Sequence, residues 1–179
     1  MITPNLATDR ILIRPLRIAD AEAIFNNWAT DSGVTEYLRW NVHESINETI
    51  DWLTYEEKNI SSENSYQWVF VNKGNNEIFG SGGISYNDEQ KMFELGYAIM
   101  KKYWNQGFTT EAAKAVVEFA VKELGQTKIF ARHAIGNPAS GKVMEKIGFI
   151  YRNEGKYLSF DGKRAFDSKE YVLTATAMI

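Results

Sequence analysis

The segment 103–112 contains the residues whose types and spacing best suit the binding of an anion. It reads Tyr-Trp-Asn-Gln-Gly-Phe-Thr-Thr-Glu-Ala and joins a predicted strand directly to the start of a clearly periodic predicted helix. A helix N-terminus presents unpaired backbone N–H groups with the positive end of the helix dipole behind them, and Gly107 lets the backbone approach a ligand closely. The loop therefore suits a pyrophosphate, although an ordinary strand-to-helix turn with one glycine explains it as well.

A second helix start whose residues could bind a ligand follows about thirty residues later. Asn137 can cap the helix, Pro138 suits its first position, and Ser140 lies in its first turn, while Gly148 marks its end. Either start by itself is explained by local capping. The two in this order indicate a shared binding site.

The composition excludes several classes of partner. The chain has 20 basic and 23 acidic residues and a net charge of -3, so it lacks the positive field that nucleic acid or an anionic membrane requires. Without cysteine, disulfides and thiolate chemistry are excluded. His43 and His133 form no zinc pattern, so no metal is expected. Because no apolar run of about 20 residues and no leader sequence are evident, a cytoplasmic location is expected.

The elements that must position these residues predict one domain over 1–179 with an α/β fold, in which a mixed sheet carries helices on its faces. Alternating apolar residues predict strands, and apolar residues at a period of 3.6 predict helices. The predicted strands are 11–13, 66–71, 78–86, 92–100, 128–135, 149–160 and 163–174, and the predicted helices are one containing Ala23, Ile24 and Trp28, then 45–60, 109–124 and 138–147. The last two strands form a hairpin that turns at Asp161-Gly162.

The glycine-rich segment Gly80-Ser81-Gly82-Gly83 lies inside a predicted strand. Phosphate-binding glycine motifs require a helix immediately after them, and none is predicted here. The segment is therefore interpreted as a bulge or a close approach of two backbones, and phosphoryl transfer is rejected.

The order of elements and several motifs resemble the GNAT superfamily of N-acetyltransferases. Residues 8–16, Thr-Asp-Arg-Ile-Leu-Ile-Arg-Pro-Leu, are similar to the opening strand of the RimJ/RimL-like branch, and residues 94–99, Glu-Leu-Gly-Tyr-Ala-Ile, followed by Tyr103-Trp104, are similar to its central strand. The resemblance implies a GNAT-like fold with a sheet of six to seven strands, splayed between the fourth and fifth, and about four helices. It also implies direct transfer of acetyl from acetyl-CoA to a primary amine.

The coenzyme site follows from the same resemblance. In the superfamily a Q/R-x-x-G-x-G/A pattern surrounds the pyrophosphate, and the central glycine is kept here while Thr109 departs from the small residue. The coenzyme arm is expected between the splayed strands, where a backbone N–H holds the thioester carbonyl. The expected coenzyme-binding residues are Tyr97, Ala98, Ile99, Trp104, Asn105, Gln106, Gly107, Phe108, Thr109, Thr110, Asn137, Ser140 and Met144.

The resemblance also implies catalytic roles. Many members place a tyrosine near the departing sulfur, but Met144 stands at that position and cannot donate a proton. In the RimJ/RimL-like branch the serine of an Asn-x-x-Ser element is the usual candidate, which is Ser140, with helix capping as the alternative. Glu94 is the first candidate for a base that takes the amine proton through water, and Asp167 and Glu36 are the next candidates. The alternative is that Glu94 is an exposed strand carboxylate, because strand alternation does not decide which face its side chain takes. His133 is a weaker candidate.

The acceptor pocket of this family lies between the first two helices. Aromatic walls and a carboxylate suit a cationic amine, although the aromatic residues also suit a core. At pH 7 an α-amine costs about 1.4 kcal/mol to deprotonate and a lysine about 4.6, so a weak base favours a peptide N-terminus; a small amine stays open. The substrate-binding candidates are Trp28, Glu36, Tyr37, Trp40, Trp52 and Asp167.

Two further questions are open at the level of the sequence. The chain is a monomer or a homodimer. The alternative to a catalyst is a regulatory or sensor module that binds an acyl-coenzyme without turnover, for which Met144 is the best support.

Overall fold

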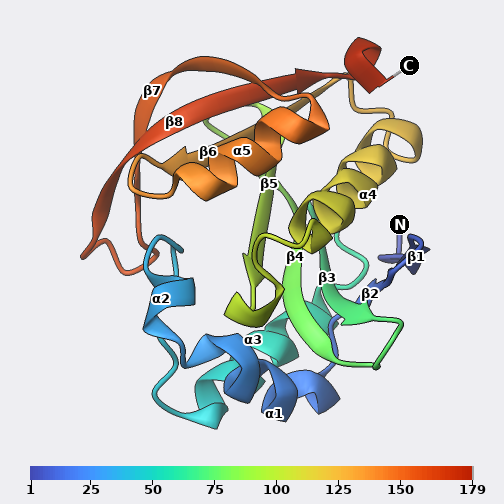
Figure 1. Cartoon of the computed structure of the whole chain (residues 1–179), viewed down its shortest axis with the longest axis vertical. Helices are drawn as coiled ribbons and strands as arrows, with labels where there is room; N and C mark the ends of the chain where they lie inside the picture. The colour runs from blue at the N-terminus through green and yellow to red at the C-terminus, as the bar shows by residue number, and fades with distance from the viewer. Residues whose placement is uncertain (179) are drawn as a thin grey trace.

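The computed structural model describes residues 1–178, which form a twisted sheet with helices on both faces (Figure 1). The strands are β1 Leu6–Ala7, β2 Ile11–Pro15, β3 Ser65–Asn72, β4 Ile78–Asn87, β5 Met92–Ile99, β6 Lys128–Ala134, β7 Ile150–Leu158 and β8 Ala165–Thr174. The α-helices are α1 Ala21–Ile24, α2 Ser32–Thr35, α3 Ile46–Lys58, α4 Phe108–Lys122 and α5 Pro138–Ile147. Short 3₁₀ turns occupy Ile18–Asp20, Lys101–Tyr103 and Ala175–Met178, and a π-helical turn spans Phe25–Ala29.

The sheet opens between its two central strands. Within residues 1–178 it has eight strands in the order β1-β2-β3-β4-β5-β6-β8-β7, and among these only β5 and β6 pair in parallel. That pairing joins Phe93–Leu95 to Ile129–Ala131 and then stops, while β5 continues beside β4 and β6 beside β8. The predicted splay is therefore confirmed.

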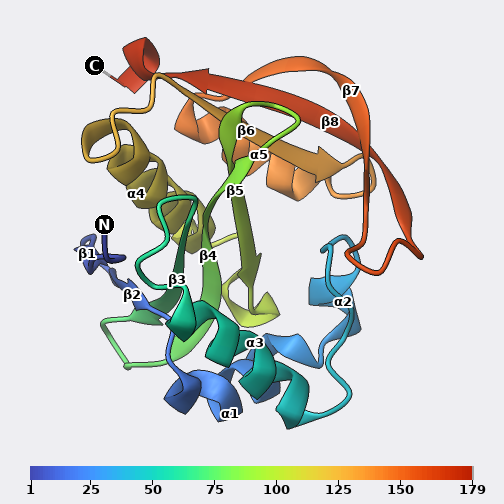
Figure 2. The ribbon, with the colours of Figure 1, turned by 180° about the vertical axis from the view of Figure 1, so that it is seen from behind.

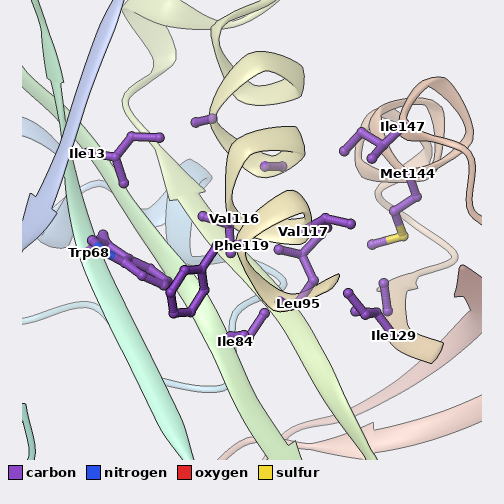
Figure 3. Packing of buried hydrophobic residues seen from close by; sticks show 14 of the residues in the cluster. Ile13, Trp68, Ile84, Leu95, Val116, Val117, Phe119, Ile129, Met144 and Ile147 are labelled. Atoms are coloured by element: carbon purple, nitrogen blue, oxygen red, sulfur yellow. The ribbon is translucent and has the colours of Figure 1, made fainter. Parts of the chain in front are cut away.

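The helices on the two faces enclose separate clusters of apolar side chains. On one face α4 and α5 pack on the sheet, and Val117 and Met144 lie against Leu95 and Ile129 (Figure 3). Behind the sheet α1 and α3 cover the other face (Figure 2), where Leu53 and Ala98 belong to the second cluster. Each fully buried apolar side chain stabilises the fold by about 1.5–3 kcal/mol.

Strand alternation, once anchored by these clusters, decides which way the candidate residues of β5 face. Leu95 and Ile99 belong to the α4/α5 cluster, and Tyr97 packs against it, whereas Ala98 belongs to the α1/α3 cluster. Because side chains alternate along a strand, Glu94 faces the α1/α3 side. Glu94 and Tyr97 therefore lie on opposite faces of the sheet.

The predicted α/β fold and its long elements are confirmed, and the differences concern short ones. The predicted helix 138–147 is α5, capped by Asn137 and ended by Gly148 at φ 109°. The strand count of six to seven is wrong by at least one, because the two-residue β1 is too short to show alternation. The four-residue α2 was not predicted, since one turn of helix shows no apolar period.

The glycine-rich segment of β4 allows close backbone contact, as predicted. The pairing of β3 with β4 shifts register between Phe70 and Val71, next to Gly80. A Cβ on Gly83 would lie 2.0 Å from the Tyr66 carbonyl oxygen. A residue with a side chain therefore does not fit at this position. Among residues 1–178, no helix combines the length and the apolar character that a membrane crossing demands.

Candidate active site

A cleft of about 840 Å³ runs through the splay and joins the two faces of the sheet. On one side it is bounded by the N-terminal ends of α4 and α5, and on the other by the segment that follows α2. Of the predicted site residues, those that line it are Glu36, Tyr37, Glu94, Tyr97, Ala98, Ile99, Trp104, Asn105, Gly107, Thr109, Thr110, Asn137, Ser140 and Met144. The fold thus gathers most of the predicted site around one continuous space.

The N-terminus of α4 has the features of an anion site. Gly107 adopts a left-handed conformation at φ 81°, Asn105 does so at φ 59°, and in the described structure no side chain caps the helix. The acidic residue of the first turn, Glu111, is held away by Thr8 and by Arg10, whose Nη2 lies 2.6 Å from Glu111 Oε2. The first-turn N–H groups are therefore open to a phosphate.

The exposed edge of β5 offers hydrogen-bonding groups to a ligand in the splay. The Ile99 carbonyl accepts from the indole Nε1 of Trp104 at 2.7 Å, and Met100 N donates to Phe79 O on β4. In an antiparallel pair, the backbone groups of alternate residues point to the same side. Tyr97 therefore shares the open side with Ile99, whereas the N–H and C=O of Ala98 face β4. Tyr97 and Ile99 are the residues that can pair with an extended ligand.

Ser140 and Tyr97 meet in the cleft. The Tyr97 hydroxyl lies 2.9 Å from Ser140 Oγ and 3.2 Å from the Ser140 carbonyl oxygen. Burial raises the pKa of Tyr97 to about 12, so the phenol keeps its proton at neutral pH. The cap of α5 comes from Asn137, whose Oδ1 accepts from Ser140 N at 3.4 Å. The serine hydroxyl is thus not consumed by capping.

Glu94 is held by a network on the opposite face of the sheet. Arg132 Nε lies 2.8 Å from Glu94 Oε1 and Arg132 Nη2 lies 3.3 Å from Oε2, which also accepts from Asn87 Nδ2 at 2.7 Å. The side chains of Arg132 and Glu94 are 8% and 20% exposed. Three such donors hold the carboxylate in a fixed orientation.

The far wall of the cleft is formed by residues 36–39, just after α2. Tyr37 reaches across to the loop before α5, where a Cβ on Gly136 would lie 2.7 Å from its hydroxyl oxygen. Hydrogen bonding to the adjacent Glu36 carboxylate raises the pKa of Tyr37. Glu36 and Tyr37 therefore bring negative charge and aromatic surface to this end of the cleft.

Other candidates lie away from the cleft. Trp28 is fully buried in the α1/α3 cluster, and Trp40 packs against the same cluster. The Trp52 indole donates to Glu56, and Asp167 pairs with Lys156 at 3.5 Å on the surface.

Two residues of the predicted phosphate pattern also turn away from the cleft. Phe108 is buried beneath Arg10, and Gln106 donates to the Lys102 carbonyl. His133 is buried beside the cleft, which it helps to line, and its ring contacts the Ala134 carbonyl and the Tyr171 hydroxyl. Among residues 1–178 there is no group of three metal-binding side chains.

Among the cleft residues that the sequence analysis missed are Arg132 and Tyr157. Arg132 pairs with Glu94, its guanidinium lies 5.2 Å from the Tyr157 ring, and the Tyr157 hydroxyl donates to the Tyr37 carbonyl at 2.7 Å. The sequence signal for them was weak, because each sits in a strand without a motif around it. Only the pairing of β5 with β6 and of β7 with β8 brings them to the site.

Comparisons with known proteins agree with this geometry. The family model described as "Acetyltransferase (GNAT) domain" matches residues 10–150. The chain belongs to the GNAT acetyltransferase family. This GNAT protein is therefore an acyltransferase, the resemblance to N-acetyltransferases is confirmed, and the family's co-substrate is acetyl-CoA. The match favours a catalyst over a module without turnover.

Three relatives extend the comparison over nearly the whole chain. An uncharacterized N-acetyltransferase of Bacillus subtilis, YoaA, is 27% identical over 169 residues, which are 94% of this chain and 95% of the relative. The crystal structure of a GNAT acetyltransferase from Bacillus anthracis has a TM-score of 0.81 at 26% identity, covering 96% of this chain and 98% of the other. A ribosomal-protein-S5-alanine acetyltransferase from Vibrio fischeri has a TM-score of 0.80 at 19% identity, covering 96% of each chain.

Proposed function

We propose that this GNAT enzyme acetylates the α-amine of a peptide or protein N-terminus, or a small primary amine, through one domain spanning residues 1–179. The observation that carries the proposal is the continuous cleft through the splay. One end of it has an anion site at α4, the middle has the Tyr97–Ser140 pair, and the far end has Glu36 and Tyr37. A thioester can thus enter from one face and an amine from the other.

The coenzyme half is built from backbone groups. Acetyl-CoA supplies an activated acyl group on a sulfur leaving group. The open N–H groups after Gly107 suit its pyrophosphate, and the free edge at Tyr97 and Ile99 suits an extended arm. An N–H held toward the acyl carbonyl there stabilises negative charge that develops on its oxygen, a contribution worth about 3–4 kcal/mol when one donor is lost. The chain's main contribution is then positioning.

Ser140 is proposed to donate a hydrogen bond to the departing sulfur. A thiolate resembling that of cysteine has a pKa of about 8.5, so it cannot take the proton of Tyr97, whose pKa is raised to about 12. Tyr97 is therefore a positioning residue. Its hydroxyl hydrogen can be donated to the Ser140 carbonyl oxygen or to Ser140 Oγ. In either case the serine's own hydrogen can turn toward the cleft, and a proton from solvent completes the neutral thiol.

Glu94 is proposed to orient the amine, directly or through one water, from the acceptor face. Its carboxylate accepts from Arg132 and Asn87, which fixes its orientation toward the amine. The proton that the amine loses passes to solvent water. An amine with a low pKa suits such a site. At pH 7 an α-amine of pKa near 8 is about 10% unprotonated, whereas a lysine is below about 0.1%.

The acceptor proposal has independent but coarse support. Glu36 and Tyr37 suit a cationic amine at the cleft mouth. The structurally similar enzyme from Vibrio fischeri is named for an alanine of a ribosomal protein, which is consistent with an N-terminal acceptor.

The test is thiol release from acetyl-CoA with N-terminal peptides, polyamines and aminoglycosides as acceptors. The chain contains no cysteine, so it contributes no thiol background. We expect release with short peptides that have a free α-amine. Ser140→Ala should lower kcat about 100-fold, in line with the loss of a positioned hydrogen-bond donor to the charge that develops on the sulfur, while coenzyme affinity changes little.

The matched control substrate is the same peptide with its N-terminus already acetylated, which should give no release. Release that depends on polyamines and not on peptides would select the small amine over the peptide N-terminus as the acceptor. Tight coenzyme binding without release on any amine would reject the proposed reaction. A Ser140→Ala variant with unchanged kcat would reject the role of Ser140.

A further inference from the structure

The β7–β8 hairpin forms an unusual contact with the cleft wall. The wall is the segment Glu36–Trp40, and it belongs to residues 36–45, which are described in full and form neither helix nor strand. In Figures 1 and 2 the turn of the hairpin lies beside the loop that follows α2. Because such a segment lacks the regular backbone hydrogen bonds of a helix or sheet, its carbonyl groups need other hydrogen-bond donors.

The hairpin supplies those partners one after another. Five consecutive carbonyl oxygens, those of residues 36–40, each accept a hydrogen bond from it. The donors in order are Arg164 Nη1 to Glu36 O at 3.1 Å, Tyr157 Oη to Tyr37 O at 2.7 Å, Arg164 Nη2 to Leu38 O at 3.0 Å, Phe160 N to Arg39 O at 2.7 Å and Arg164 Nη2 to Trp40 O at 2.8 Å.

Arg164 is the centre of this arrangement. Its Nη1 also lies 3.5 Å from Thr35 O, so the four hydrogens of its two terminal nitrogens meet four carbonyls of one segment. The guanidinium lies 5.3 Å from the Phe166 ring, and its Nε is buried without a hydrogen-bond partner within the described structure. A flat fork with five donors suits this task, and a lysine does not reproduce it.

We infer that Arg164 is the positioning residue for the acceptor, and that it acts by holding the Glu36–Trp40 wall in shape. Arg164 does not itself line the cleft, whereas Glu36, Tyr37, Leu38 and Arg39 do. Its effect must therefore pass through the wall. This inference rests on the proposed function, because it assigns the wall to the amine and not to the coenzyme.

Independent contacts support a rigid wall. The Arg39 Nε donates to Leu158 O at 2.9 Å, and Asn41 Nδ2 donates to Asp161 Oδ2 at 2.9 Å. The Arg39 guanidinium also lies 4.5 Å from the Phe160 ring. Segments more than 115 residues apart in the sequence are thus joined again at the C-terminal end of the wall, in addition to the contacts of Arg164.

The experiment compares Arg164→Gln and Arg164→Lys with Lys163→Gln, which removes the same charge from the neighbouring, exposed position in the turn. For the best amine of the panel, Arg164→Gln should raise the acceptor KM about 10- to 30-fold, because several carbonyls lose their donors at once. The KM for acetyl-CoA should change less than about 2-fold. Arg164→Lys should be intermediate, and Lys163→Gln should resemble the unsubstituted enzyme.

A second measurement does not require turnover. Hydrogen exchange of the backbone amides in residues 36–42 should become faster in Arg164→Gln, while amides at the starts of α4 and α5 keep their rates. If Arg164→Gln does not fold, Tyr157→Phe removes the single donor to Tyr37 O and should give a smaller effect in the same direction.

The outcomes separate the inference from the proposed function. No turnover by the unsubstituted enzyme on any amine rejects the proposed function, and the exchange rates still test the wall. Turnover with an unchanged acceptor KM and unchanged exchange in Arg164→Gln overturns the inference. Equal increases in both KM values also overturn it, because they indicate general loss of structure.

Discussion

The two halves of the cleft are built in different ways. The proposed coenzyme half consists of two helix starts, each made by residues adjacent in the sequence: Gly107 before α4 and Asn137 before α5. The proposed acceptor half consists of an irregular wall, 36–40, whose carbonyls are held by a hairpin about 120 residues away. The first half therefore depends on local backbone geometry, and the second on long-range contacts. The difference predicts that each half can be damaged without the other.

Of the two glycine substitutions that separate the halves, the larger effect is expected from Gly136→Ala, which damages the proposed acceptor half. The new Cβ would lie 2.7 Å from the Tyr37 hydroxyl oxygen and 2.9–3.0 Å from two of its ring carbons, so the ring and the wall must move. Overpacking of this kind costs about 1–3 kcal/mol, and we expect the acceptor KM to rise about 10-fold or more. Steady-state kinetics with each substrate varied in turn provides the measurement.

Tyr37→Phe combined with Gly136→Ala is the control for that mechanism. Removal of the hydroxyl relieves the shortest contact, so the double variant should recover part of the lost acceptor affinity. Failure to recover any would indicate that the loop itself, and not the contact with Tyr37, is responsible. A matching loss of coenzyme affinity would contradict the separation of the two halves.

A smaller effect is expected from Gly107→Ala, which damages the coenzyme half. The left-handed conformation at φ 81° costs a residue with a Cβ about 1–2 kcal/mol, and the added carbon has room, since its nearest neighbour is Arg10 Nη2 at 3.4 Å. We expect coenzyme affinity about 5- to 10-fold weaker by titration calorimetry, with the acceptor KM nearly unchanged.

Gly107→Asn is the matched control, because asparagine tolerates the left-handed region better than other residues with a side chain. It should bind the coenzyme more tightly than Gly107→Ala. The reverse order would show that open space, and not backbone conformation, is what the glycine provides.

The smallest effect concerns Tyr97 and pH. Its pKa is raised to about 12 in the folded protein, against about 10 in the unfolded chain. The folded state therefore keeps a proton that the unfolded state releases, so this contribution to stability is fully present below pH 10 and is lost as pH rises toward 12.

Urea unfolding at pH 9 and pH 11 measures this dependence. The free energy of unfolding should fall less steeply with pH in Tyr97→Phe than in the unsubstituted protein. Some fall should remain, because burial also raises the pKa of Tyr157 to about 12. An identical slope in both proteins would mean that Tyr97 titrates normally in the fold.

The long elements and the starts of α4 and α5 were largely predictable from the sequence. The helix 138–147 matches α5 at both ends, because Asn137, Pro138 and Gly148 are local signals that act on adjacent backbone. Gly107 likewise marks the start of α4. The acceptor half was predicted less well: Glu36 and Tyr37 line the cleft, but Trp28 and Trp40 pack in the core, since an aromatic side chain suits both environments equally.

The sequence by itself determined the order of the long strands and helices, the two helix starts that suit a coenzyme, and the absence of chemistry by cysteine side chains. Only the tertiary structure decided which face Glu94 takes, that Ser140 meets Tyr97, that Arg132 pairs with Glu94, and that Arg164 binds the carbonyls after α2. The physical reason is the range of the interactions. Capping and strand periodicity act within a few residues, whereas the register of β5 with β6 and the docking of the β7–β8 hairpin depend on the packing of the whole sheet.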